Sequence, residues 1–136
     1  MTYDGRMDFE KEVAHHASDG YVQTVPVRPW SDEGPMPKNI WIGYKFVARD
    51  VDDGTHVKLE LYCDMTDGED GGSWLPVMTE YLDAGGWGAG HTPCESGKDP
   101  AEILTGPHPV VYVRTDDVTE MRYKKFSIRE IDPNDL

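Results

Sequence analysis

Apolar and polar side chains alternate with a period of two in residues 40–50 and again in residues 57–64. Such a period is typical of a strand that buries one face. In the first stretch the apolar face includes Phe46, and in the second it includes Leu61. The two stretches therefore predict two neighbouring strands whose apolar faces lie together in a core.

A tight turn joins these two strands, because Asp53 and Gly54 stand between them and glycine accepts the positive φ of a hairpin turn. An acidic, glycine-rich loop follows at residues 64–72, and an extended pattern returns at residues 74–83. These features predict an antiparallel meander of three strands.

Shorter extended stretches predict further strands at residues 6–13, 21–27, 110–114 and 121–131. In the last of these we expect Phe126 and Ile128 to point inward. Asp99 and Pro100 indicate one helical turn inside a long loop at residues 84–109. The sequence thus predicts an all-β fold, an antiparallel β-sandwich of the jelly-roll type.

Residues 1–136 have the length of one domain. The chain opens almost directly into strand-like sequence. The domain is therefore expected either to be complete or to have its first strands missing or supplied by another chain, since a missing strand leaves an open sheet edge. A loop as long as 84–109 is usually functional or packed on a partner, which favours an oligomer or a larger assembly.

The net charge of −13 argues against nucleic acid as a partner, because nucleic-acid binding needs a basic surface. No apolar run is long enough to span a membrane, and the first residues lack the apolar stretch of a signal peptide. The acidity suits a soluble protein in a salty or calcium-containing medium, and the alternative is that it serves solubility alone. The expected location is extracellular or at the cell surface, and a cytoplasmic location stays open.

Basic and aromatic side chains recur on the polar faces of the predicted strands. Cations neutralise carboxylates or sulfates and rings stack on sugars, so this set predicts a surface for an anionic glycan. The alternative is that the cations pair with acidic side chains such as Glu60 on neighbouring strands. The candidate ligand-binding residues are Trp41, Lys45, Arg49, Lys58, Tyr62, Tyr123, Lys125 and Arg129.

The acidic loop offers carboxylates at Asp64, Asp67, Glu69 and Asp70. Calcium takes six to eight oxygen ligands, which such loops provide, so the loop is a candidate calcium site. The spacing does not match an EF-hand, and a solvated hairpin loop is the alternative.

Cys63 and Cys94 are the only cysteines. A disulfide between them would fix the long loop to the sheet, stabilise the fold by about 3–4 kcal/mol, and imply an oxidising compartment. The alternative is a buried thiol and an unrelated loop thiol.

The rhythm of strands through residues 41–87, with the closing Lys-x-Phe-Ser-Ile-Arg-Glu-Ile at 124–131, resembles the concanavalin and laminin-G-like jelly rolls. Within these it is most similar to polysaccharide-lyase-like and glycan-binding modules, over roughly residues 3–132. The resemblance implies a secreted β-sandwich. In such lyases a Tyr and a His act beside a neutralising Arg or Gln, and only Tyr123, Arg129 and His15 are available for these roles here.

The sequence therefore favours a non-catalytic module that binds a glycan or other protein subunits in an extracellular assembly. One alternative is a lyase of uronate-containing glycans, with Tyr123 as the base and Arg129 as the group that neutralises the carboxylate. The other is a structural subunit of a filament, shell or surface layer.

Overall fold

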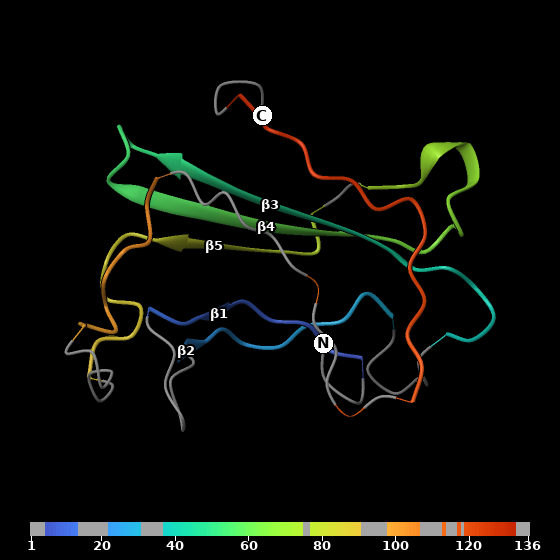
Figure 1. The fold of residues 1–136 in the computed structure, drawn as a ribbon, viewed down its shortest axis with the longest axis horizontal. Helices are drawn as coiled ribbons and strands as arrows, with labels where there is room; N and C mark the ends of the chain where they lie inside the picture. The colour runs from blue at the N-terminus through green and yellow to red at the C-terminus, as the bar shows by residue number, and fades with distance from the viewer. Residues whose placement is uncertain are drawn as a thin grey trace. The chain divides into compact units, whose positions relative to one another are not determined.

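Five short strands and one 3₁₀ turn, Glu69–Gly71, make up the regular structure of the residues that the structure describes. This computed structural model describes residues 5–13, 22–30, 37–74, 77–90, 98–106, 113, 117 and 119–132. The chain divides into two units, Met1–Thr105 and Gly106–Leu136, and each is described by itself. All five strands lie in the first unit and pair antiparallel, so the predicted all-β character is confirmed there (Figure 1).

The predicted meander is the main sheet, in the order β3 (Gly43–Val51), β4 (His56–Asp64) and β5 (Thr79–Asp83). The β3–β4 turn has positive φ at Asp52, Asp53 and Gly54, as the Asp-Gly signal predicts. The third strand is shorter than predicted. It begins at Thr79, and residues 75 and 76 lie outside the described residues.

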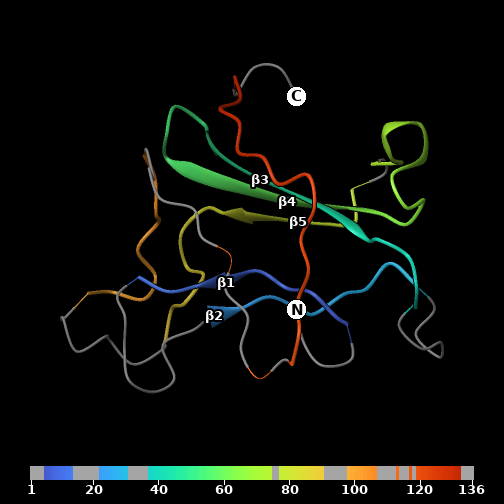
Figure 2. The same cartoon turned by 45° about the vertical axis from the view of Figure 1, so that its right-hand side comes forward.

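A second, smaller sheet pairs β1 (Glu10–Lys11) with β2 (Val22–Gln23), and Met7 and Val27 form a further bridge. The predicted strands 6–13 and 21–27 are thus present only in part. Figures 1 and 2 both show this sheet beside β5, on the side away from β3.

The core lies between the two sheets and contains Phe9, Val22, Leu61 and Trp87. The strand register pairs Phe46 with Leu61, so the apolar faces of β3 and β4 coincide as the alternation predicts. We call this the inner face of the main sheet and the opposite one the outer face. The described residues show two antiparallel sheets in contact, and a jelly-roll sandwich stays a prediction.

Burial differs from the simple in-and-out pattern at both faces. Phe46 lies on the inner face and contacts the ring of Phe9, yet it is 60% exposed, because β3 is an edge strand. On the outer face Val47, Glu60 and Tyr62 are buried. Long cationic side chains over this face contribute to that burial, since Lys and Arg stems cover the surface beneath them.

In the second unit the predicted strand 121–131 is wrong. The structure assigns no strand to residues 119–132, and all of them are exposed, with Phe126 at 61% and Ile128 at 63%. The alternation is present, but a strand also needs a hydrogen-bonded neighbour. The predicted strand 110–114 lies outside the described residues except for Val113.

In the part of the chain that the structure describes, no helix has the length and apolar character needed to cross a membrane.

One turn of chain at residues 98–105 packs on the turn after β5. Asp99 begins it as predicted, since its Oδ1 accepts from the Ala101 amide at 2.8 Å and its carbonyl accepts from the Glu102 amide at 3.0 Å. Gly88 has φ +104 and lies so close to the backbone of Pro100 that a Cβ there would collide with the Pro100 carbonyl. This contact requires glycine.

We expect Gly88→Ala to lower the free energy of unfolding by more than about 2 kcal/mol, through left-handed strain and the clash with Pro100. Gly90→Ala is the matched control, because Gly90 also has positive φ but has open space where a Cβ would stand. It should lose only about 1 kcal/mol. Urea unfolding of both variants measures the difference, and equal losses would contradict the packing of 98–105 on this turn.

Candidate functional site

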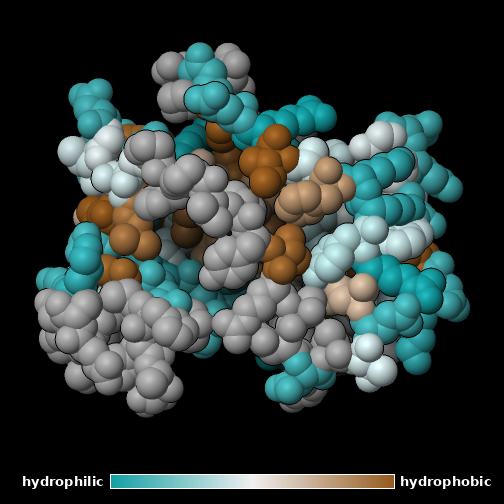
Figure 3. Space-filling model, viewed as in Figure 1, coloured by the Kyte–Doolittle hydropathy of each residue, from teal (hydrophilic) through white to brown (hydrophobic). Residues whose placement is uncertain are grey.

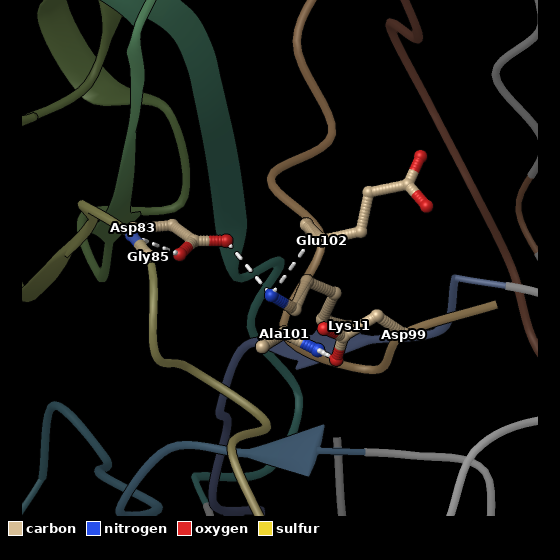
Figure 4. A network of polar contacts seen from close by, with 6 residues as sticks. All are labelled: Lys11, Asp83, Gly85, Asp99, Ala101 and Glu102. Carbon is tan, nitrogen blue, oxygen red and sulfur yellow. Dashed lines mark hydrogen bonds and ion pairs between the residues drawn. The ribbon is translucent and has the colours of Figure 1, made fainter.

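A buried ion pair connects the two sheets of the first unit (Figure 4). Lys11 Nζ lies 2.9 Å from Asp83 Oδ2, and the two side chains are only 4% and 3% exposed. The same ammonium donates to the Glu102 carbonyl at 3.2 Å, and Asp83 Oδ1 accepts from the Gly85 amide at 3.2 Å. The network joins β1, the end of β5 and the 98–105 segment.

Sequence reasoning missed Lys11. Lys11 lies two positions after Phe9, so a strand with a period of two directs both side chains inward. A lysine that points inward requires an acidic partner. The Lys11 ammonium also lies 5.1 Å from the centre of the Trp87 ring, which in turn packs on Tyr81. The ion pair therefore also positions the aromatic side chains beside β5.

The predicted basic and aromatic face forms part of the outer face of the main sheet. The register pairs Lys45 with Tyr62 and Arg49 with Lys58. Glu60 lies between the cations, with Arg49 Nη2 at 3.5 Å and Lys58 Nζ at 3.2 Å. For Arg49 and Lys58 the structure therefore fits the alternative interpretation of the sequence, in which the cations pair with acidic side chains.

Lys58 also lies 3.0 Å from Glu80, and hydrogen bonds to Glu80 and then Glu60 raise its pKa. Lys45 lies over the ring of Tyr62 at 3.8 Å, so that ring face is occupied by a cation of the same chain. Trp41 precedes β3, and its amide donates to Asp67. A glycan contact on this face stays a prediction.

The other three candidate ligand-binding residues lie in the second unit. Tyr123, Lys125 and Arg129 are all exposed, and the structure does not place them on the main sheet.

Asp64 organises the acidic loop from the end of β4. Its Oδ1 accepts from the Thr66 hydroxyl at 2.6 Å and from the amides of Thr66 and Ser73 at 3.0 Å each. Its Oδ2 accepts from the Gly68 amide at 3.0 Å. The Thr66 hydroxyl and the Ser73 amide stabilise the charged form and lower the pKa of this buried carboxyl to about 2.

The other acids of the predicted calcium site, Asp67, Glu69 and Asp70, are exposed. Among the described residues no group of three or more His, Cys, Asp or Glu side chains is arranged to hold a metal ion. The Asp64 carboxylate already accepts hydrogen bonds from the backbone amides of its own loop. Calcium binding here stays a prediction.

Cys63 is a free thiol on the inner face, and burial followed by the nearby Asp64 raises its pKa to about 11. It is therefore protonated and a weak nucleophile near neutral pH. Cys94, its expected partner in a disulfide, lies outside the described residues.

The candidate catalytic residues are not brought into an enclosed site by the described structure. Tyr123 and Arg129 lie in the exposed segment 119–132, and His15 lies outside the described residues. Proton abstraction beside a carboxylate depends on a base held in a site that excludes water.

A groove runs beside β5, on the edge that does not pair with β4. It has a volume of about 420 Å³ and lies between the extended 23–27 run and residues 79–81 of β5. Trp87 lines it, and within the described ranges the buried indole Nε1 of this residue has no hydrogen-bond partner. Sequence reasoning missed this groove, because the two walls are far apart in the chain. Its lining residues are Gln23, Thr24, Val25, Val27, Thr79, Glu80, Tyr81 and Trp87.

No protein-family model, curated protein or solved structure matches this chain. Its function is therefore argued from its own residues.

We expect Lys11→Met to lower the free energy of unfolding by about 3–5 kcal/mol, because it leaves Asp83 charged and buried. Adding Asp83→Asn should recover part of this loss, since the amide oxygen still accepts from Gly85. Lys98→Met, which breaks an exposed pair with the Glu102 carboxylate, should lose no more than about 1 kcal/mol. Urea unfolding tests all three, and a similar loss from both single lysine variants would contradict the role of the buried pair.

The Asp64 loop should give the fold a distinct acid sensitivity. The folded pKa of about 2 lies below the ordinary value of 3.8, so Asp64 stabilises the fold above about pH 4. That contribution is lost as the pH falls toward 2. Chemical unfolding between pH 5 and pH 2 should show the decline, and Asp64→Asn should be less stable at pH 5 and lose this part of the slope. An unchanged slope in the variant would assign the acid sensitivity to other carboxyls.

Proposed function

We propose that this protein is a non-catalytic β-structured module that joins other protein chains in an extracellular assembly. The observation that carries the proposal is the exposed segment 119–132. It has the apolar alternation of a strand and no strand assignment. Its large apolar side chains Met121, Tyr123, Phe126 and Ile128 are all exposed.

Exposed apolar side chains in such a row mark a contact surface for another molecule. Figure 3 shows brown, hydrophobic side chains open to solvent among teal polar ones on one face of the molecule. The strand β3 has nine residues, has β4 as its one neighbour among the described strands and leaves Phe46 exposed, and edges of this kind accept strands from other chains. Glycan binding has weaker support, because Lys45, Arg49 and Lys58 are engaged with Tyr62, Glu60 and Glu80.

The mass of the native particle tests the proposal. By light scattering at micromolar concentration, the chain should exceed its monomer mass of 15.3 kDa. Ile128→Asp should return it to a monomer, because a buried carboxylate in an apolar contact is strongly unfavourable. Ile40→Asp is the matched control, since Ile40 is exposed outside this segment and the charge change is identical.

A native chain that stays monomeric under these conditions would contradict the proposal. The same measurement with EDTA tests the calcium prediction separately. A particle that dissolves in EDTA and reforms with calcium would implicate the acidic loop.

A further inference from the structure

The groove beside β5 has the features of a site for an added strand. Among the described strands β5 lies at the edge of the main sheet, with β4 on one side and the groove on the other. Strand addition to such an edge uses main-chain hydrogen bonds for affinity and side-chain pockets for specificity. Tyr81, Val25 and Val27 give the groove apolar walls, and Val25 is 82% exposed.

Trp87 contributes the largest aromatic side chain to the lining of the groove. Its indole Nε1 is buried and has no acceptor among the described residues. Because this nitrogen is closed to solvent, an occupant of the groove meets the face or edge of the indole ring rather than its N–H, and the ring offers flat apolar contact area.

The residues around the groove also favour a particular charge in its occupant. Glu80 lines it, and the chain as a whole has a net charge of −13. Glu80 pairs with Lys58 at 3.0 Å through Oε2 but stays 54% exposed, so it can accept from a second cation, and a basic chain is attracted to this edge while an acidic one is repelled.

The segment 121–129 of this same sequence has the matching chemistry. It contains four basic residues and no acidic one. The rest of the chain therefore carries a net charge more negative than the −13 of the whole. Lys125 has a positive φ of 53°, as in a β-bulge, which shifts the alternation by one residue. With that shift Met121 and Tyr123 fall on the same face as Phe126 and Ile128. The basic residues are Arg122, Lys124, Lys125 and Arg129.

We propose that segment 121–129 of a second copy of this chain adds as a strand to β5 and fills the groove between β5 and the 23–27 run. Phe126 and Ile128 enter the groove against Tyr81 and Trp87, and the basic side chains lie along Glu80. This inference rests on the proposed assembly function and names its partner and its contact site.

A synthetic peptide of residues 119–132 tests the site directly. It is titrated against the full-length chain that carries Ile128→Asp, so that the groove is free. Saturable binding is expected, and Glu80→Lys in the full-length chain should weaken it by about tenfold or more. Glu69→Lys is the matched control, since Glu69 is exposed in the 3₁₀ turn and the charge change is the same. Circular dichroism of each variant confirms that it is folded.

Disulfide cross-linking then tests where the segment lies on the full-length chain. The full-length chain carries Cys63→Ser and Cys94→Ser, so that the introduced cysteine is its single thiol. A peptide with Ser127→Cys should form a disulfide with the full-length chain bearing Thr79→Cys in the groove. It should form none with Thr55→Cys, which lies in the exposed β3–β4 turn.

Absence of peptide binding, equal weakening by the two Glu→Lys variants, or equal cross-linking at the two positions would overturn the proposal. So would a Ser127→Cys, Thr79→Cys chain that closes a disulfide within one monomer, which would place the segment in its own groove. If Ile128→Asp dissolves the native particle while Glu80→Lys and Glu69→Lys both leave it intact, the assembly function stands and only the groove assignment fails.

Discussion

The first unit depends on one buried ion pair. Lys11 and Asp83 stand 72 positions apart in the chain, and their contact removes both charges from water. That loss of hydration is offset only because every strong partner is present: the opposite charge, the Gly85 amide and the Glu102 carbonyl. The pair fixes the end of β5 against β1, and β1 carries β2 with it. The two walls of the groove are thereby held at a set separation.

The sequence predicted well those features that depend on neighbours along the chain. The β3–β4 hairpin follows from alternation and from the Asp-Gly turn, and the register that pairs Phe46 with Leu61 is the one that keeps both apolar faces together. Lys11 shows the limit of this reasoning. Its inward direction follows from the same alternation, but no local pattern identifies Asp83 as its partner. The groove escaped prediction for the same reason.

The segment 121–131 shows why a strand pattern does not guarantee a strand. Alternation describes which side chains face the same way, whereas a strand exists only when a neighbouring backbone supplies its hydrogen bonds. The side chains expected to be buried, Phe126 and Ile128, are among the most exposed apolar groups of the described residues. On the main sheet the basic residues share a face as predicted, and the buried carboxylate of Glu60 binds Arg49 and Lys58. The alternation predicts the shared face, and this pairing is the alternative that the sequence left open.

Charge distribution also constrains how copies of this chain can meet. Two molecules with a net charge of −13 repel each other in most orientations, and the repulsion is strongest at low salt. The basic segment 121–129 is the exception, so it directs the approach toward an acidic surface of the partner. Because the segment and the groove are different surfaces of the same chain, their contact is heterologous, and a pair of copies keeps one unused segment and one unused groove. Contacts of this kind extend into open chains unless the rotation between copies closes a ring. The proposed strand addition would therefore build a filament or a closed ring from this one chain, whereas a layer would need a second contact.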